Sequence, residues 1–382
     1  MLSTHASNFP FQTSRFKLPP SHFELKMILF NDYPLIHKTT MHVGGNARFY
    51  AEVMDTDELI SVLSQAKSEK LPVFILGAGS NTLIDDEGFD GYIIHPAMHQ
   101  VEWQVQDNGE ILVKAGAGVL FDEIVRESCE RNLGGIESLS GIPGSTGGSL
   151  VQNIGAYGQE ISESFVSAEA VDKNTLESVT LGREDIQFGY RHTALKTKEN
   201  PLIVTSVTLR LLPFDDVLAV KRCEERGFKK LVLNPPKTAL ELRNLILETR
   251  KSKAMCYDEN DYNTHGVGSF FVNPVVTPEL AQQIHEIAVQ RNLRPMSQFD
   301  APNGVKLSAA WLIENAGFDK GYLHDGAALS EKHCLAIINR DHATSVDVIG
   351  LAKEIIDRVQ TTFGVTLSPE VVYLSRKGIS CI

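Results

Sequence analysis

Apolar and polar residues alternate along the chain in a pattern that predicts an α/β protein. Residues 46–53 alternate like a strand, and a helix capped by Asp55 or Thr56 follows. A short apolar run then predicts a buried strand that leads directly into Gly77–Asn81. Together these elements form a β–α–β unit over residues 36–95.

Strands dominate the middle of the chain, and helices dominate its last third. The turn at 172–174 is expected to join two strands as a hairpin. Thr277 and Pro278 begin a helix, with threonine as the N-cap and proline at the first helical position. The other predicted strands cover 110–114, 165–171, 176–180, 202–212, 333–339 and 370–375, and the other predicted helices cover 308–316, 345–363 and most of the connection 214–254.

The charge balance limits which ligands the chain can bind. Its 382 residues suggest two or three domains, and 36 Lys and Arg against 48 Asp and Glu give a formal charge of −12. Such a chain repels phosphates, so neither nucleic acid nor a membrane is expected as a partner. A phosphate ligand must therefore be held locally, by backbone N–H groups or by a few lysines and arginines.

The cysteines and the N-terminal segment favour a cytoplasmic protein. The five cysteines form no CxxC pair and the histidines have no ligand spacing, so neither a disulfide framework nor a metal site is expected. No apolar run approaches the roughly 20 residues that cross a bilayer. The segment Met1–Lys26 lacks the apolar core of a secretory signal, which favours a disordered tail, with a transit peptide as the alternative.

Residues 140–160 hold an unusual density of glycine. Six of the 29 glycines lie in SGIPGSTGGSLVQNIGAYGQE. Glycine costs backbone entropy, so the density implies positive φ angles or a close approach to the backbone. A phosphate or a flat ring lying on open N–H groups is one explanation, and a meandering loop at a domain junction is the other.

A second glycine pair, Gly77 and Gly79, follows a predicted strand. It resembles the dinucleotide fingerprint, but Thr82 occupies the third glycine position and 83–91 reads as a loop rather than a helix. A pyrophosphate-binding turn of another fold and a plain tight turn both remain open.

Three polar residues lie beside apolar ones in ways that allow chemistry. Ser269 lies in the Gly-flanked segment 266–274 and could donate a proton or merely cap a turn, since the spacing is not that of a Gly-x-Ser-x-Gly nucleophile. Arg191 follows an aromatic residue and suits carboxylate recognition. Glu370 begins an apolar strand, so its carboxylate either pairs or faces solvent.

Five segments resemble one family in their order and spacing. They are LGAGSNTLI (76–84), SLSGIPGSTGG…QNIGAYGQE (138–160), FGYR (188–191), GSFFVNP (268–274) and PEV (369–371). They resemble the UDP-N-acetylenolpyruvoylglucosamine reductases, flavin-dependent enzymes of bacterial cell-wall synthesis. The resemblance runs from about residue 36 to the end, and the connection 214–254 is similar to that of the longer of the family's two types.

The resemblance implies an α+β, three-domain flavoenzyme. Its FAD-binding fold is of the PCMH or vanillyl-alcohol-oxidase type, and a C-terminal α/β domain binds the substrate. The expected parts are a disordered N-terminal extension 1–35, an FAD-binding region 36–213 with subdomains 36–95 and 96–213, the helical connection 214–254, a substrate-binding domain 255–365, and a C-terminal strand region 366–382 that returns to the active site.

The resemblance also assigns roles to individual residues, with Ser269, Arg191 and Glu370 as the catalytic group. The residues expected to bind FAD non-covalently are Gly77, Ala78, Gly79, Ser80, Asn81, Thr82, Gly141, Ile142, Pro143, Gly144, Ser145, Thr146, Gly147, Gly148, Gln152, Asn153, Gly155 and Tyr157. Those expected to bind the substrate are Tyr190, Lys253, Asn273, Lys306 and Lys320, although for each lysine a solvated position is the simpler interpretation.

The implied reaction reduces UDP-N-acetylglucosamine enolpyruvate to UDP-N-acetylmuramate with NADPH as the co-substrate. NADPH reduces the flavin, which then gives hydride to the terminal carbon of the enolpyruvyl double bond. Arg191 would polarise the substrate carboxylate, and Ser269 would protonate the neighbouring carbon. Glu370, if buried, is expected to have a raised pKa and to donate a hydrogen bond. A monomer is expected.

Two departures from the family pattern concern the substrate contacts. Longer-type members carry a tyrosine in the inserted loop, but the comparable stretch 229–236 (KKLVLNPP) has none, and Val372 stands where arginine is common. Two other functions remain as alternatives, a sugar or alcohol oxidase of the same flavin fold and a non-catalytic protein that binds nucleotide sugars.

Overall fold

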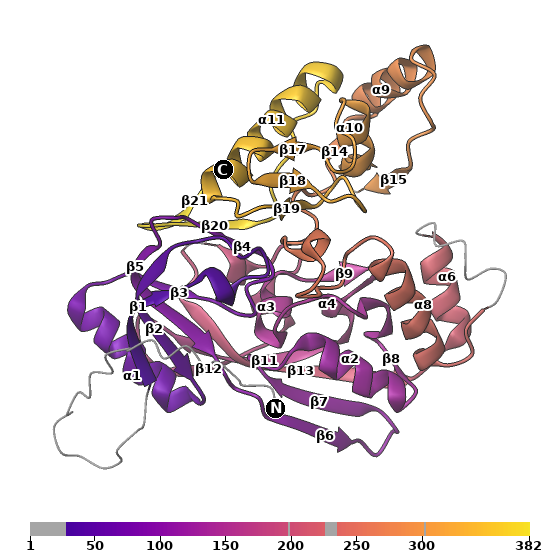
Figure 1. Ribbon diagram of the computed structural model, residues 1–382. Coiled ribbons are helices and arrows are strands. Elements are labelled where there is room, and N and C mark those ends of the chain that lie inside the picture. Colours follow the sequence, from indigo (N-terminus) through magenta and orange to yellow (C-terminus); the bar gives the residue numbers. More distant parts are fainter. Residues whose placement is uncertain (1–27, 198, 226–234, 302) are drawn as a thin grey trace, which may run out of the picture.

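The computed structural model describes residues 28–197, 199–225, 235–301 and 303–382. Two parts are visible in Figure 1. One holds the sheets of the first half of the chain, and the other holds the C-terminal helices α9 (Pro278–Gln290), α10 (Ala309–Asn315) and α11 (Ser345–Phe363). Strand β20 (Val372–Ser375) lies at the border between the two parts.

The first sheet has the strand order β1-β2-β5-β3 and carries helix α1 (Thr56–Glu69). Asp55 is the N-cap, as predicted, because its side chain accepts the Glu58 N–H at 2.9 Å. The strands are β1 (Ile28–Pro34), β2 (Asn46–Val53), β3 (Val73–Ile75) and β5 (Phe89–Pro96).

The prediction that residues 1–35 are disordered is wrong from Ile28 onward, because Ile28–Pro34 form β1. The strand pairs antiparallel with β2. The Tyr33 ring stacks on Tyr50 with centroids 4.2 Å apart, and Leu29 is buried. These partners belong to a separate strand further along the chain, so the local pattern alone gave no sign of them. Residues 1–27 lie outside the described part.

The second sheet has the order β12-β11-β13-β7-β6, and its hairpin at 172–174 is confirmed by the antiparallel pairing of β11 with β12. The strands are β6 (Val101–Val105), β7 (Ile111–Gly116), β11 (Phe165–Asp172), β12 (Ser178–Leu181) and β13 (Leu202–Pro213), and β8 (Leu133–Gly134) pairs with the end of β13. The remaining short elements of this region are α2 (Phe121–Glu130), α3 (Thr146–Val151), α4 (Ile161–Ser164), α5 (Arg183–Ile186), β9 (Gly155–Ala156) and β10 (Gln159–Glu160).

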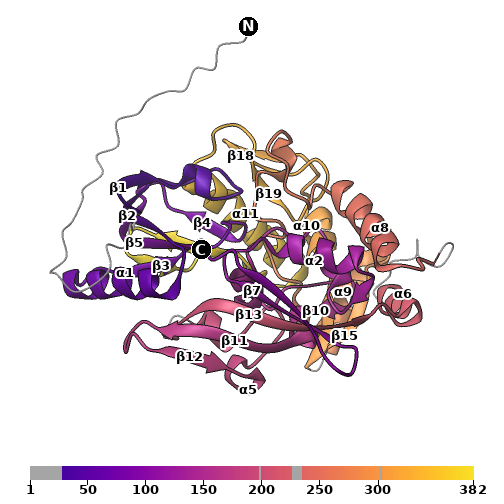
Figure 2. The same cartoon turned by 90° about the horizontal axis from the view of Figure 1, so that it is seen from below.

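The connection 214–254 is helical where it is described. It contains α6 (Asp216–Glu225) and α8 (Ala239–Lys251), and residues 226–234 lie outside the described part. Figures 1 and 2 both place α6 and α8 together, at the end of the molecule where α2 lies. Most of the stretch 229–236, where the sequence lacks a tyrosine, lies outside the described residues.

The predicted C-terminal helices are confirmed. Thr277 caps α9, and α11 ends at Gly364, which has a φ of 70°. The strand predicted at 333–339 is shorter in the structure, where it covers Ile337–Asn339. Its first residues lie in a turn in which the Ser330 N–H donates to the Ala336 carbonyl. The strands here are β14 (Val275–Val276), β15 (Gln298–Ala301), β16 (Gly304–Leu307), β17 (Leu323–His324), β18 (Ala327–Leu329) and β19 (Ile337–Asn339).

The chain end pairs with a strand from the first domain. Strand β20 runs parallel to β4 (Thr82–Ile84) and antiparallel to β21 (Gly378–Ser380). The loop predicted at 83–91 is therefore wrong in detail, because these residues finish β4 and begin β5. The partner of β4 comes from the opposite end of the chain, and Leu83 is buried in the C-terminal core. The pairing brings the C-terminal residues to the end of the loop Gly77–Asn81.

Candidate active site

The two glycine-rich segments of the sequence face each other in the structure. The Ser80 hydroxyl donates a hydrogen bond to the Pro143 carbonyl at 2.9 Å. A Cβ atom on Gly77 would lie 2.6 Å from the Ser145 hydroxyl oxygen. The loops 77–81 and 141–148 therefore form one surface, although several strands and helix α2 separate them in the chain.

The loop 77–81 presents a run of open amides. Within the described residues, none of its five backbone N–H groups donates a hydrogen bond. Gly79 has a φ of +67°, and a Cβ there would lie 2.0 Å from the Lys38 carbonyl oxygen, so only glycine fits. Buried or half-buried N–H groups need acceptors, and consecutive ones form an anion-binding concavity. This loop suits a pyrophosphate.

The loop 141–148 is different, because the protein itself accepts most of its N–H groups. The Gly141 N–H donates to Asp122 at 2.6 Å, Thr146 to Val119 at 2.8 Å and Gly147 to Ala117 at 3.0 Å. The N–H groups of Ile142 and Gly148 also have acceptors. In this loop only the N–H groups of Gly144 and Ser145 donate no hydrogen bond to a described residue. Gly141 and Gly147 serve close packing instead, since a Cβ atom on either would lie within 3 Å of another side chain.

Arg191 and Glu370 meet as the resemblance implies. Arg191 Nε lies 3.4 Å from Glu370 Oε1, and the two side chains are 25% and 15% exposed. Gln152, expected at the cofactor, donates from Nε2 to Glu370 Oε1 at 2.9 Å. The Arg191 guanidinium also donates to the Gly155 carbonyl at 2.6 Å. The guanidinium and the amide hold the carboxylate in a set orientation.

A strained turn presents Arg191. Gly189 and His192 pair across a two-residue turn, and Arg191 has a φ of 54°. The Asn153 side chain, fully buried, donates to the Gly189 carbonyl at 2.8 Å and to Glu160 at 2.9 Å. Asn153 therefore supports this turn, and a non-glycine residue at positive φ marks a position over-determined by its surroundings.

Ser269 lies beside Glu370 through backbone pairing. The Phe270 carbonyl accepts the Glu370 N–H at 2.8 Å, and Phe271 forms a β-bridge with Pro369. The Ser269 side chain is half-buried, and its hydroxyl makes no hydrogen bond within the described residues. The structure thus brings the three expected catalytic residues together.

The expected substrate residues form two groups. In the first, Lys306 Nζ lies 4.6 Å from the centre of the Tyr190 ring, and the Asn273 side chain lies near the Tyr190 hydroxyl. Burial raises the pKa of Tyr190. Asn273 Oδ1 also accepts the Ala309 N–H at 2.9 Å, which fixes its amide. Tyr190 thus bridges the FAD-binding region and the C-terminal part.

The second group is a positive cluster that includes a residue missed by the sequence reasoning. Burial, followed by the charges of Arg250 and Lys320, lowers the pKa of Lys253. Burial, followed by the charges of Lys253 and Lys320, lowers the pKa of His333 to about 4. The Leu335 N–H donates to His333 Nδ1 at 3.1 Å, which leaves the ring proton on Nε2. Lys253 and Lys320 therefore lie near each other, and their two positive charges together attract an anion.

Lys196 is a second residue that the sequence reasoning missed. It is half-buried, and burial lowers its pKa, with Glu370 acting in the opposite direction and Arg191 in the same one. It follows Arg191 closely in a segment that reads as an ordinary polar loop. Only the fold reveals that this cation belongs to the site.

Two of the residues expected to bind the cofactor, Tyr157 and Thr82, pack against other parts of the protein. Tyr157 packs against the cluster formed by α6 and α8, and burial raises its pKa. Thr82 is buried in β4, where it pairs with Val372. Their contact with a cofactor stays a prediction.

Comparison with known proteins decides the family. Residues 260–374 match the C-terminal domain of UDP-N-acetylenolpyruvoylglucosamine reductase, and residues 47–177 match an FAD binding domain. A UDP-N-acetylenolpyruvoylglucosamine reductase of Corynebacterium glutamicum is 38% identical over 350 residues, covering 90% of this chain and 92% of that protein. The chain belongs to the UDP-N-acetylenolpyruvoylglucosamine reductase family. It is an oxidoreductase with FAD as its cofactor.

Other members of the reductase family give the same picture. The protein of that name from Mycobacterium tuberculosis is 36% identical over 351 residues, covering 89% of this chain and 94% of its own length. The crystal structure of the Thermus caldophilus reductase has a TM-score of 0.60 at 24% identity and covers 91% of this chain and 98% of its own. This likeness supports the fold. No helix among the described residues is long and apolar enough to span a membrane.

Proposed function

We propose that this chain reduces UDP-N-acetylglucosamine enolpyruvate to UDP-N-acetylmuramate with NADPH, in the synthesis of the bacterial cell-wall precursor. The observation that carries the proposal is the meeting of Arg191, Glu370 and Ser269 beside the open amides of 77–81. We further propose a cytosolic monomer, in keeping with five cysteines that are all free thiols.

The loop 77–81, with Gly144 and Ser145, would hold the FAD pyrophosphate through open N–H groups. Bound there, FAD would supply the hydride-transfer chemistry that links NADPH to the substrate alkene. The protein supplies the remaining charges and protons.

Arg191 would bind and polarise the substrate carboxylate. Its orientation is already set by Glu370 and by the Gly155 carbonyl, so little reorganisation is needed on binding. Lys196 adds a second cation beside it. As negative charge spreads onto the carboxylate during hydride addition, both cations stabilise it.

Ser269 would give its hydroxyl proton to the carbon next to the one that receives hydride. The hydroxyl is free of hydrogen bonds to the described residues, so it can turn toward the substrate. Glu370 would hold Arg191 in place through their ion pair.

Lys253 and Lys320 would hold the diphosphate of the UDP group, since both are positive, exposed and close to each other beside His333. Tyr190, Asn273 and Lys306 would contact the sugar-nucleotide end where the two parts of the molecule meet.

The test separates the two half-reactions. Ser269→Ala is expected to leave the reduction of bound flavin by NADPH within about twofold, and to slow its reoxidation by substrate by about 100-fold or more, the usual contribution of a proton donor. Stopped-flow absorbance at the flavin band measures both. Ser375→Ala in β20 removes a hydroxyl that donates to the Gly378 carbonyl and is the control. Equal loss of both half-reactions in Ser269→Ala would contradict the role.

A further inference from the structure

One face of helix α8 lies against the turn at Gly141. Arg243, Leu247 and Arg250 are spaced four and three residues apart, so they share that face. A Cβ atom on Gly141 would lie 2.7 Å from Leu247 Cδ2 and 3.4 Å from Arg250 Nε. Gly141 has a φ of +75°, so the turn needs glycine for its backbone as well as for space.

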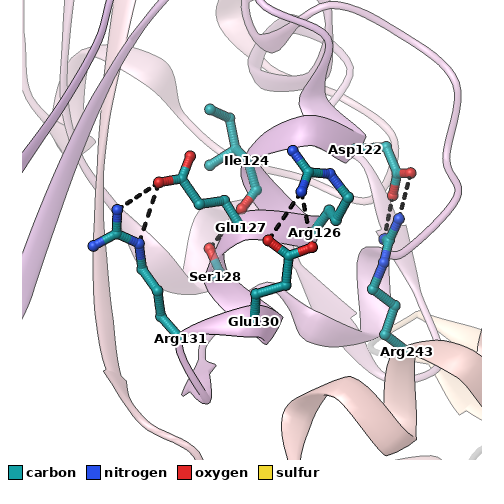
Figure 3. A network of polar contacts seen from close by, with 8 residues as sticks. All are labelled: Asp122, Ile124, Arg126, Glu127, Ser128, Glu130, Arg131 and Arg243. Carbon is teal, nitrogen blue, oxygen red and sulfur yellow. Dashed lines mark hydrogen bonds and ion pairs between the residues drawn. The ribbon is translucent and has the colours of Figure 1, made fainter.

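Asp122 of α2 joins this helix to the turn. Its carboxylate accepts two hydrogen bonds from the Arg243 guanidinium, at 2.6 and 2.8 Å, as Figure 3 shows. The same carboxylate accepts the Gly141 N–H at 2.6 Å. Burial alone would raise the pKa of Asp122, but hydrogen bonds from Arg243 and Gly141 outweigh it and lower the pKa. The Asp122 carboxylate is therefore charged, and it accepts three hydrogen bonds.

This pair differs from the other ion pairs of α2. Figure 3 also shows Arg126 with Glu130 and Arg131 with Glu127, which are pairs within one helix and about half exposed. Such pairs contribute little. Arg243 is only 8% exposed and lies 121 residues from Asp122, so this pair links separate elements.

The link continues to the open amides. Two residues after Gly141, the Pro143 carbonyl accepts the Ser80 hydroxyl at 2.9 Å, and Gly144 and Ser145 follow with their open N–H groups. Hydrogen bonds thus link Arg243 to Asp122 and Asp122 to Gly141, and the backbone of 141–143 connects that turn to the surface where the two loops face each other.

We propose that Asp122 and Arg243 are positioning residues for FAD. Asp122 sets the place of the Gly141 turn, and Arg243 acts through Asp122, so the connection 214–254 shapes the cofactor site without touching the reacting atoms. The proposal rests on the proposed function, because it takes the loop after Gly141 to contact FAD.

The experiment measures FAD affinity and thermal stability separately in purified full-length apoprotein. Asp122→Ala removes the acceptor for Gly141 and is expected to weaken FAD binding, followed by flavin fluorescence, by about 10- to 100-fold, the factor for one charge-assisted hydrogen bond. Asp122→Asn is isosteric and folds where the alanine variant fails. It has one acceptor oxygen for three donors, so a loss of about 3- to 10-fold is expected.

Arg222→Met is the matched control. Arg222 lies in α6 of the same connection and pairs with Glu163 of α4 at 3.0 Å, and neither partner is Asp122 or Gly141. It should lower the melting temperature slightly and leave FAD affinity within about twofold. If Asp122→Asn is folded and binds FAD within twofold of the unaltered protein, the pair is purely structural and the proposal is overturned. If the unaltered protein binds no FAD, the proposed function fails instead.

Discussion

The two glycine-rich loops look alike in sequence and behave differently in the structure. In 77–81 none of the five N–H groups donates a hydrogen bond to a described residue. At Gly79 a side chain would clash with the Lys38 carbonyl. In 141–148 the N–H groups of Gly141, Thr146 and Gly147 are taken by the protein. The first loop leaves its amides without acceptors among the described residues, and the second uses Gly141 and Gly147 to pack closely.

A high density of glycine therefore indicates that the backbone is constrained, but it does not show which constraint applies. A Cβ on Gly147 would lie 2.9 Å from Ala117 Cβ, so that glycine lets α3 approach the residues that follow β7. Positive φ, close packing and ligand approach all favour glycine. Only the hydrogen-bond partners of the amides separate the three causes.

The largest expected effect comes from Gly79→Ala. The Cβ would clash with the Lys38 carbonyl, and the φ of +67° adds strain, so the run of open amides must shift. We expect FAD affinity to fall by about 100-fold or more, corresponding to roughly 3 kcal/mol. Flavin content at purification and titration of the apoprotein with FAD measure it.

Gly109→Ala is the control for Gly79→Ala, because Gly109 has a φ of +81° and no atom of the described residues lies within 4 Å of its Cβ position. It carries the backbone strain alone, at a cost of about 1 kcal/mol in stability, and should bind FAD normally. Retention of FAD by Gly79→Ala at full affinity would remove the first loop from the cofactor site.

A smaller effect is expected from Gly77→Ala, whose Cβ would lie 2.6 Å from the Ser145 hydroxyl of the other loop. We expect about a tenfold loss of FAD affinity from crowding between the loops. Ser145→Gly removes the hydroxyl and costs only a few tenths of a kcal/mol as an N-cap change, so the double variant should recover most of the affinity. A double-mutant cycle with no coupling would show that the loops are not held against each other here.

The smallest effect is expected from Gly148→Ala. Gly148 lies in α3, and its Cβ would meet only the Ser145 hydroxyl at 3.3 Å. Alanine favours the helix by up to about 1 kcal/mol, which offsets that contact. FAD affinity should stay within about threefold, and the melting temperature should change little. A tenfold loss of affinity would mean that the cofactor approaches the Cα of Gly148. Both loops would then contact the cofactor closely, although their amides differ in hydrogen bonding.

Local elements were largely predictable. The caps at Asp55 and Thr277 and the bounds of α11 follow from side chains within one helical turn of each end. Strand β1 and the pairing of β4 with β20 were not predictable, because each depends on a partner strand elsewhere in the chain. The turn at 330–336, closed by the Ser330 N–H and the Ala336 carbonyl, replaced the start of a predicted strand.

The candidate site divides in the same way. Arg191, Glu370 and Ser269 were expected from the family resemblance, and the structure brings them together. Lys196, His333, Asp122 and Arg243 were missed, because a lone lysine, histidine or ion-pairing residue in a sequence carries no sign of what it will face. The roles of Gln152 and Asn153 also became visible only through their partners.

The amino-acid sequence by itself determined the helices, most strands, the family and the types of residue available for chemistry, because these follow from short-range spacing and from recognisable motifs. The tertiary structure decided which amides stay open, which cations gather at the site and which carboxylate orients Arg191. Those outcomes depend on hydrogen bonds and burial between segments from opposite ends of the chain, and no local pattern contains that information.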